Sequence, residues 1–289
     1  MKKKIFISLG LMSGTSMDGV DLSIIKSDGV NYVEQICDKY FEFDDNLHDS
    51  LVNLRECLNK SGDLDKYYKK IKEIEKKYTL FNCKIINEIK SKNNLEIDLI
   101  GFHGQTILHL PKEKISEQLG DGNLLSQISI CTVINRFRQN DLDNNGQGAP
   151  LTPIFHGLVS KKIQENFNLE YPMNIINIGG ITNVSQIINS KNLEKNIFAY
   201  DIAPGNCLID EWIRKNSNKR YDENGDIANK GKVNDLILNQ AIENFEIVSI
   251  KESLDIKNFD LSFAKGLSLQ DGCATLTKFT AYLISEGLK

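Results

Sequence analysis

The densest group of potentially reactive residues is a polar segment between two apolar runs near the N-terminus. In order, it reads Ser13, Gly14, Thr15, Ser16, Met17, Asp18, Gly19, Val20 and Asp21. Its glycines allow a tight bend and a close approach of the backbone to a ligand, and its hydroxyls and N–H groups can donate to phosphate oxygens. Asp18 and Asp21 could hold the Mg²⁺ that accompanies ATP. The stretch from Gly14 to Asp21 is therefore our candidate ATP site, and a hairpin turn with purely structural polar residues is the alternative.

The spacing within this segment differs from that of the common nucleotide-binding loops. No Gly-Lys-Ser/Thr follows it, which excludes a Walker loop. Gly14 and Gly19 do not form G-x-G-x-x-G either. The apolar runs on both sides, within residues 5–25, instead predict a strand, a turn and a second strand. Any phosphate would then be bound by a β-hairpin.

A second glycine-rich turn occurs in the other half of the chain. The stretch from Asn177 to Asn183 reads NIGGITN and follows an apolar run that predicts a strand. Glycine pairs are common in turns, so the motif is weak by itself. Because it repeats the chemistry of the first segment, Gly179, Gly180 and Asn183 are predicted to bind ATP as well.

Four further side chains follow predicted strands or precede a glycine-rich loop. His103 and Gln105 could hydrogen-bond a substrate, and the Arg138 guanidinium could bind a carboxylate through two hydrogen bonds. Asp201 could act as a general base on water or on a sugar hydroxyl. Three of these side chains have a structural alternative. His103 could be a histidine whose ring is hydrogen-bonded within a turn, and Arg138 a surface arginine. Asp201 could start a turn or cap the next helix.

The elements that must position these side chains alternate between strands and helices. The sequence predicts, in chain order, a β-rich region over 1–45, helices within 46–93, a strand over 97–102 that ends at His103, a polar turn at 120–123, a buried strand and turn over 172–180, a strand over 197–200 that ends at Asp201, and helices over 207–215 and 274–284. This order is typical of α/β proteins with partly parallel sheets. Ligand sites of such proteins gather where strands end.

The length of the chain indicates two domains. Its 289 residues are enough for two hydrophobic cores. A loop rich in Gly and Asn over 143–150 is the predicted boundary. The predicted domains are therefore an N-terminal phosphate-hairpin domain over 1–145 and a second α/β domain over 146–289.

Charge and cysteine usage exclude several classes of protein. The net charge is −4 and Lys is interleaved with acidic residues, so no basic surface for nucleic acid is predicted. No apolar stretch is long enough to span a membrane. The six cysteines include no C-x-x-C pair, which argues against a zinc site and a disulfide framework and favours a reduced, cytoplasmic protein. The apolar start is read as a first core strand rather than a signal peptide, because a polar turn follows it directly.

Together, the motifs resemble the anhydro-N-acetylmuramic acid kinase family of the actin/hexokinase/Hsp70 superfamily. The most specific strings are SGTSMDGVD and GQGAP. The supporting strings, in the same order as in the family, are GFHGQT, QLGDGNLL, NIGGITNVS, APGN followed by Asp210 and Trp212, Tyr221-Asp222 with Gly225, Ala228 and Gly231, and the closing ATLT. The resemblance covers nearly the whole chain.

The resemblance implies a fold and a reaction. The fold would have two domains of the actin/hexokinase type, related to ribonuclease H, with two phosphate turns facing each other across a cleft. The enzyme would use ATP and water to open the 1,6-anhydro ring of anhydro-N-acetylmuramic acid and to phosphorylate O6, during peptidoglycan recycling. Asp201 matches the family's catalytic base, and the segment from Gly14 to Asp21 matches its ATP-binding segment. The lactyl carboxylate of the amino sugar would suit Arg138.

The sequence departs from the family pattern at three places. Ile202-Ala203 stands where Thr-Gly is usual, and Arg136 stands where Asp is usual. The family continues beyond the position of Lys289 with a Gly-rich segment that lines the adenosine pocket. We therefore expect the last part of the fold to be missing, the apolar side of the helix over 274–284 to be exposed, and the chain as given to be a poor kinase.

Two other functions remain open at this stage. A glycoside hydrolase that uses Asp201 with a second carboxylate would open the sugar without ATP. A non-catalytic remnant of a kinase would bind the sugar weakly or merely fold. A homodimer is compatible with the sequence, which does not determine the oligomeric state.

Overall fold

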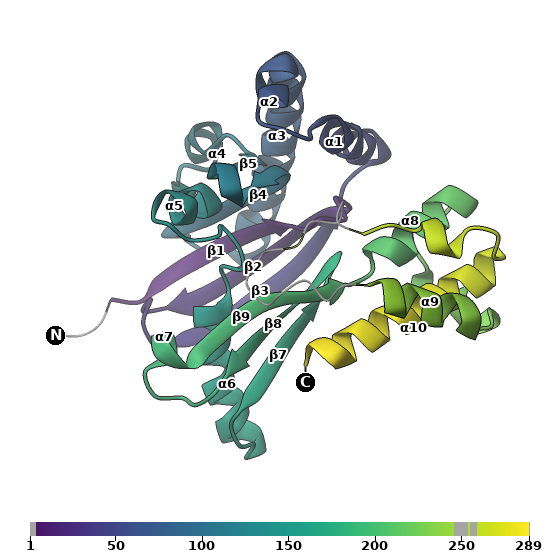
Figure 1. The fold of residues 1–289 in the computed structure, drawn as a ribbon. Helices are drawn as coiled ribbons and strands as arrows, with labels where there is room; N and C mark the ends of the chain where they lie inside the picture. The colour runs from purple at the N-terminus through teal and green to yellow at the C-terminus, as the bar shows by residue number, and fades with distance from the viewer. Residues whose placement is uncertain (1–3, 246–253, 255–258, 289) are drawn as a thin grey trace. The chain divides into compact units, whose positions relative to one another are not determined.

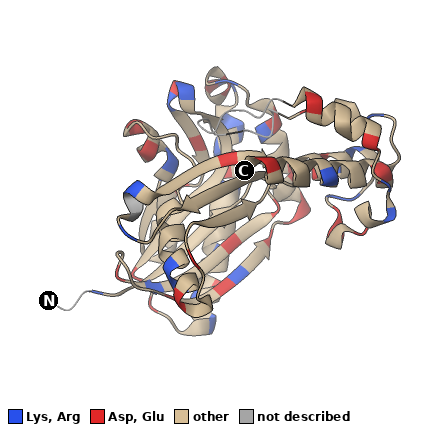
Figure 2. Ribbon diagram, turned by 60° about the horizontal axis from the view of Figure 1, so that its bottom comes forward, with Lys and Arg blue, Asp and Glu red and all other residues tan. Residues whose placement is uncertain are grey.

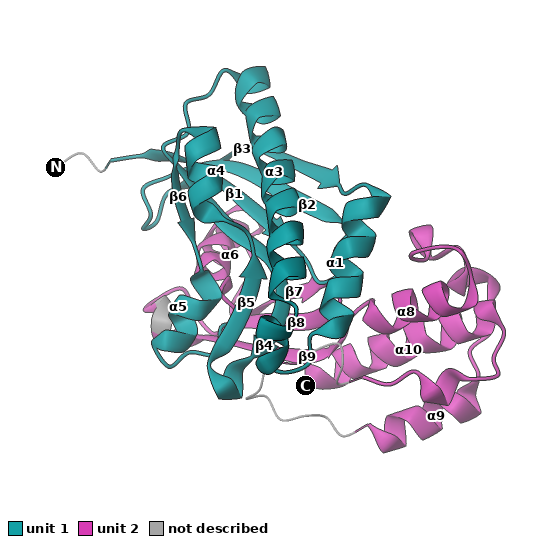
Figure 3. Cartoon of the chain, turned by 90° about the horizontal axis from the view of Figure 1, so that it is seen from above, with its two compact units in different colours: residues 1–149 teal, residues 150–289 magenta. Residues whose placement is uncertain are grey.

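The computed structural model of the chain describes residues 4–245, 254 and 259–288. Its contacts divide the chain into two compact units, Met1–Ala149 and Pro150–Lys289, which Figure 3 shows in different colours. The boundary predicted from the sequence, between residues 145 and 146, lies a few residues earlier. Each unit combines one sheet with its own helices (Figure 1).

Unit 1 is built on a six-stranded mixed sheet with the order β3-β2-β1-β4-β5, in which β6 also pairs with β4. Its strands are β1 (Phe6–Ser13), β2 (Gly19–Ser27), β3 (Val33–Glu42), β4 (Leu99–Leu110), β5 (Ile115–Leu119) and β6 (Thr132–Asn135). The pairs β1–β4 and β4–β6 are parallel, and the other pairs are antiparallel. The predicted strand, turn and strand at the N-terminus are therefore confirmed, and so is a partly parallel sheet.

The helices of unit 1 cover its sheet through apolar side chains at helical spacing. They are α1 (Asp45–Cys57), α2 (Gly62–Lys66), α3 (Tyr68–Asn93), α4 (Gly122–Ser129) and α5 (Phe137–Asp143). On α3, Ile71, Ile74 and Tyr78 are buried at intervals of three to four residues. Tyr78 stacks on Phe102 of β4, with ring centroids 6.0 Å apart. The predicted helical region over 46–93 is confirmed.

The strand β4 is longer than predicted, because it continues through His103 to Leu110. Its register with β1 shifts between Phe102 and Gln105, where Gly104 has a φ of +77°. A Cβ at this glycine would lie 2.4 Å from the Leu119 carbonyl oxygen. The predicted strand end is therefore wrong. The glycine permits a bulge, and β5 supplies a new partner for the rest of the strand.

Unit 2 is built on a three-stranded antiparallel sheet with the order β7-β8-β9. Its elements are β7 (Met173–Ile178), β8 (Ile181–Ile187), β9 (Ile197–Pro204), α6 (Pro153–Phe167), α7 (Leu193–Asn196), α8 (Cys207–Asn216), α9 (Asp235–Asn244) and α10 (Leu269–Gly287). The strand β9 runs past the predicted end at Asp201, because it stays paired with β8. The prediction that β7 is buried is wrong, since Met173 is the one buried residue of this edge strand.

The helix α10 contains the predicted helix over 274–284 and forms the core of unit 2. Its buried face includes Cys273, Leu276, Phe279 and Leu283. The Phe279 ring makes edge contacts with Phe245 and Phe263. The expected exposed apolar face on this helix is therefore wrong, because the unit's own side chains cover it.

The structure shows a mixed α/β fold in both units, as predicted. Acidic and basic residues are intermixed along the ribbon (Figure 2). Within the described ranges, none of the helices has the length and apolar character needed to cross a membrane. The assignment to the actin/hexokinase type, with a cleft and a missing last part, stays a prediction.

Candidate functional site

The predicted phosphate turn is held in place by Gln105. The Ser13 hydroxyl lies 2.6 Å from the Gln105 Oε1 atom and 2.8 Å from the Gly19 carbonyl oxygen. The Gln105 amide nitrogen donates to the Gly14 carbonyl oxygen at 2.9 Å. Gln105 is fully buried. Its side chain therefore fixes both the start of the turn and its position relative to β4.

The remaining residues of the turn divide into buried and accessible groups. The side chains of Met17 and Val20 are buried in the core of unit 1, so only their main-chain atoms are available to a ligand. The Ser16 hydroxyl donates to the Asp18 carboxylate at 2.7 Å. The Arg55 guanidinium donates to the Thr15 carbonyl oxygen at 3.3 Å. The accessible part of the turn thus presents hydroxyls, main-chain groups and one carboxylate.

Three carboxylates, those of Asp18, Asp21 and Asp38, interact at the C-terminal end of this turn. Burial raises the pKa of Asp21, and the charges of Asp18 and Asp38 raise it further. A bound cation would relieve this repulsion. Within the part of the chain that the structure describes, no group of three or more His, Cys, Asp or Glu side chains could hold a metal ion. The two predicted ligands nevertheless fit Mg²⁺, which often binds through one or two carboxylates, water and substrate phosphates.

We expect Gln105→Leu to weaken nucleotide binding about tenfold. The change leaves the Ser13 and Gly14 groups without their partner, and an unsatisfied buried polar group costs about 1–3 kcal/mol. Titration of the variant with ATP would measure the loss. The control is Gln35→Leu, which changes an exposed glutamine on β3 of the same sheet. Equal affinity of wild type and Gln105→Leu for ATP would contradict a positioning role for Gln105.

Two of the predicted substrate-binding residues are in direct contact. The Arg138 Nε atom donates to the His103 Nε2 atom at 2.9 Å. The His103 Nδ1 atom therefore carries the ring proton and donates to the Gly104 carbonyl oxygen at 2.7 Å. Burial and the Arg138 charge together lower the pKa of His103 to about 4. The imidazole is consequently neutral and orients the guanidinium.

The lowered pKa predicts an acid-sensitive fold. Between pH about 4 and 6.5 the unfolded chain binds a proton at His103 that the folded chain does not bind. The stability contributed by neutral His103 is therefore present above pH 6.5 and is lost as the pH falls through this range, by about 1.4 kcal/mol for each pH unit. Urea unfolding of wild type and His103→Gln between pH 7 and 4.5 would measure it. The same pH dependence in both proteins would contradict the prediction.

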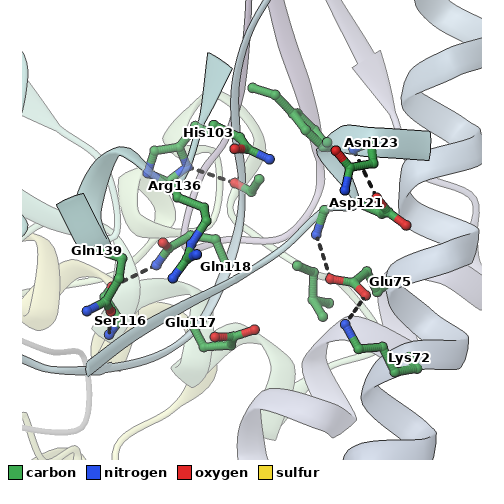
Figure 4. A pocket seen from close by; sticks show the side chains of 16 residues that line it. Lys72, Glu75, His103, Ser116, Glu117, Gln118, Asp121, Asn123, Arg136 and Gln139 are labelled. Carbon is green, nitrogen blue, oxygen red and sulfur yellow. Dashed lines mark hydrogen bonds and ion pairs between the residues drawn. The ribbon is translucent and has the colours of Figure 1, made fainter. Parts of the chain in front are cut away.

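A polar cavity of about 390 Å³ opens beside His103 within unit 1 (Figure 4). Its walls come from α3, β4, β5, the start of α4 and the turn between β6 and α5. On the α3 side, Lys72 and Glu75 form an ion pair at 2.6 Å. On the other sides, Glu117 and Arg136 line the cavity. Burial raises the pKa of Glu117, and the Glu75 charge adds to this effect.

The sequence interpretation assigned no function to the residues of β5 and α4 in this cavity. Their only signal was the string QLGDGNLL, which spans the end of β5 and the start of α4. The Asp121 side chain caps α4 by accepting from the Asn123 and Leu124 N–H groups at 3.0 Å. This part of the motif therefore shapes the wall of the cavity.

The predicted residues of unit 2 gather at one end of its sheet. The turn at Gly179-Gly180 connects β7 and β8, and its carbonyl oxygens accept from the N–H groups of the segment after β9. Gly205 donates to Gly180 at 2.9 Å, and Asn206 donates to Gly179 at 2.8 Å. The register of β8 and β9 places Asn183 opposite Asp201. The second glycine turn and the candidate base thus belong to one cluster.

Asp201 neither starts a turn nor caps the helix α8, which were its two structural alternatives. It lies inside β9 rather than in a turn, and the residue at the cap of α8 is Asn206, which makes no side-chain cap. Asp201 is partly exposed. One carboxylate oxygen accepts from the Leu254 N–H at 2.8 Å. A hydrogen-bonded, partly exposed carboxylate next to a glycine turn has the chemistry of a general base.

Comparison with known proteins identifies the family to which the chain belongs. The model of the family described as anhydro-N-acetylmuramic acid kinase matches residues 6–289. The chain is 50% identical over 288 residues to the anhydro-N-acetylmuramic acid kinase of Pelagibacter ubique (strain HTCC1062), covering 99% of this chain and 75% of the relative. It is 35% identical to the same-named protein of Agrobacterium fabrum, covering 96% and 74% of the two chains.

A third relative, from Zymomonas mobilis, carries the same name and is 33% identical, with 98% of this chain and 76% of the relative covered. The family match and these identities agree over nearly the full length of the chain. The chain therefore belongs to the anhydro-N-acetylmuramic acid kinase family and is an enzyme of the kinase class.

Proposed function

We propose that this kinase opens 1,6-anhydro-N-acetylmuramic acid with water and transfers the γ-phosphoryl group of ATP to O6. The product is N-acetylmuramic acid 6-phosphate, and the process served is peptidoglycan recycling. Family membership supports the proposal. The observation that carries it is a glycine turn between two strands in each unit, with the partly exposed Asp201 carboxylate inside β9, opposite Asn183.

The bonds that form and break assign a role to Asp201. Its carboxylate would take a proton from the water that attacks the anomeric carbon. The bond between that carbon and O6 breaks, and O6 attacks the γ-phosphorus, so that ADP leaves. One water and one ATP are consumed for each sugar. A carboxylate with one main-chain hydrogen bond is oriented for such a transfer.

The two glycine turns would bind the phosphates of ATP. In unit 1, we assign this role to the main chain and hydroxyls from Gly14 to Asp21, and in unit 2 to Gly179, Gly180 and Asn183. Asp18 and Asp21 would hold Mg²⁺, which neutralises phosphate charge. The mutual repulsion of these carboxylates supports this assignment.

The sugar would be bound by unit 1 near His103 and Arg138. Their hydrogen bond leaves His103 neutral and fixes the guanidinium. For Gln105 we replace the predicted direct contact with a positioning role, because its amide is buried and bonded to the phosphate turn. An ATP-dependent reaction on a cell-wall sugar also favours the cytoplasm. A homodimer and the absence of nucleic-acid binding stay predictions.

The test is to incubate the purified chain with the anhydro sugar, with and without ATP, and to measure sugar and ADP. We expect the sugar to be consumed only with ATP, with one ADP formed for each sugar. Consumption without ATP would favour the hydrolase, and no consumption in either mixture would favour the non-catalytic alternative.

A further inference from the structure

The last turn of α1 brings a cation to the predicted phosphate turn of unit 1. The Arg55 Nη1 atom donates to the Thr15 carbonyl oxygen at 3.3 Å, although the two residues lie 40 positions apart in the chain. The charged side chains of the segment from Gly14 to Asp21 are both carboxylates, and Asp38 adds a third at its C-terminal end. Arg55 therefore supplies positive charge at a turn where a triphosphate would need it.

The buried face of α1 fixes the position of Arg55. The side chains of Leu51, Leu54 and Leu58, on both sides of it in the chain, have no exposed surface and belong to the core of unit 1. At the end of the helix, the Leu58 N–H donates to the Arg55 carbonyl oxygen at 3.2 Å. Arg55 itself is partly exposed. Its backbone is thus anchored in the core, while its side chain reaches the surface at the turn.

Support of the turn is a weak explanation for this arginine. Gln105 already holds the start of the turn, and the Phe43 N–H donates to the Asp18 carbonyl oxygen at 2.8 Å. The contact of Arg55 is longer than an ordinary N–H···O hydrogen bond, and its acceptor is an uncharged main-chain carbonyl. A phosphate oxygen would be a better acceptor, because a hydrogen bond to a charged group is roughly twice as strong as one between neutral groups.

Space for a ligand lies next to this contact. Among the described residues, a Cβ added at Gly14 would come within 4 Å of one atom beyond its chain neighbours, the Ser16 hydroxyl oxygen at 3.9 Å. Ser16 is exposed. Since a guanidinium has five N–H donors, its contact with Thr15 is compatible with a second contact, to a phosphate bound over Gly14 and Ser16.

We propose that Arg55 binds the phosphates of ATP, as a substrate-binding residue outside the segment from Gly14 to Asp21. The inference rests on the proposed function for the identity of the ligand. The Arg55 guanidinium pairs with phosphate oxygens, while main-chain groups and hydroxyls of the turn donate to the same phosphates. Its charge also offsets part of the repulsion between the triphosphate and the carboxylates of Asp18 and Asp21.

The experiment is calorimetric titration of the full chain, in the presence of Mg²⁺, with ATP and with inorganic tripolyphosphate, which lacks the nucleoside. We expect Arg55→Gln to weaken binding of both ligands about tenfold, and Arg55→Lys, which keeps the charge, to weaken it less. Rising salt concentration should also weaken binding less steeply in Arg55→Gln, because one ion pair is lost. The matched control is Arg214→Gln, which removes an exposed arginine from the last turn of α8 in unit 2 and should bind both ligands as wild type does.

A second measurement on wild type requires no variant. Phenylglyoxal modifies accessible arginines, and peptide mass spectrometry identifies the modified positions. Bound ATP should slow the modification of Arg55 and leave that of Arg214 unchanged. Equal modification of Arg55 with and without ATP would overturn the inference.

Three results of the titration would also overturn it: unchanged ATP affinity in Arg55→Gln, weaker binding of ATP with unchanged binding of tripolyphosphate, or no binding of tripolyphosphate to wild type at millimolar concentration. A parallel assay with ATP and the anhydro sugar separates this inference from the proposed function. Phosphorylation with an unchanged KM for ATP in Arg55→Gln would overturn the inference alone. A wild type that binds tripolyphosphate through Arg55 but phosphorylates no anhydro sugar would overturn the proposed function alone.

Discussion

Asp201→Asn should lower kcat by about 10²- to 10⁴-fold, which is the usual contribution of a general base. The substitution keeps the shape of the side chain and one oxygen that can accept from the Leu254 N–H. It removes the group that takes the proton from water. Affinities for ATP and for the sugar should therefore stay close to those of wild type. Steady-state kinetics with calorimetry of both ligands would measure the two effects separately.

The matched control for this change is Asp235→Asn, which alters an exposed carboxylate in the first turn of α9. This variant should keep full turnover. Near-normal turnover in Asp201→Asn would rule out Asp201 as the base. Loss of sugar or ATP binding together with turnover would indicate a structural role instead.

Gly205→Ala should destabilise unit 2 and abolish tight ATP binding. A Cβ at this position would lie 1.9 Å from the Gly179 carbonyl oxygen. Because that atom belongs to the backbone, the glycine turn itself must move. The N–H groups of Gly205 and Asn206 would then lose their acceptors. Overpacking of this kind costs about 1–3 kcal/mol, which urea unfolding would detect.

The control for this change is Gly62→Ala, because a Cβ at Gly62 would meet no atom within 4 Å. We expect its stability and ATP affinity to match wild type. If Gly205→Ala bound ATP as tightly as wild type, the turn at Gly179-Gly180 would not be part of the nucleotide site.

The hairpin from β1 to β2 could be predicted because its signals are local. Two apolar runs flank a short segment with glycines at both ends, and each feature acts on neighbouring residues. The helix α8 was also predictable, since its apolar residues recur at helical spacing directly after a turn. In both cases the tertiary structure agrees with the preference of the isolated segment.

The ends of β4 and β9 could not be predicted, since distant partners determine them. Residues after His103 continue as a strand because β5 pairs with them. Residues after Asp201 do so because they pair with β8. The prediction that β7 is buried was wrong for a related reason. Apolar content alone does not show that a strand will lie at the edge of a sheet.

The positioning role of Gln105 could not be predicted from the sequence either. Its position in the motif marked it as a polar residue near the site. The partners of its amide, however, lie 91 and 92 residues earlier in the chain. The cavity lined by Arg136 and Glu117 is also assembled from six separate helices and strands, and no single segment reveals it.

In the proposed function, one reaction cleaves the anhydro ring with water and places the phosphate of ATP on O6. The most direct measurement is the mass spectrum of the product formed from the anhydro sugar and ATP in water enriched in ¹⁸O. We expect a sugar 6-phosphate with one ¹⁸O at the anomeric carbon, and no opened sugar when ATP is omitted. An opened, unphosphorylated sugar formed without ATP, or a phosphorylated sugar with an intact anhydro ring, would contradict it.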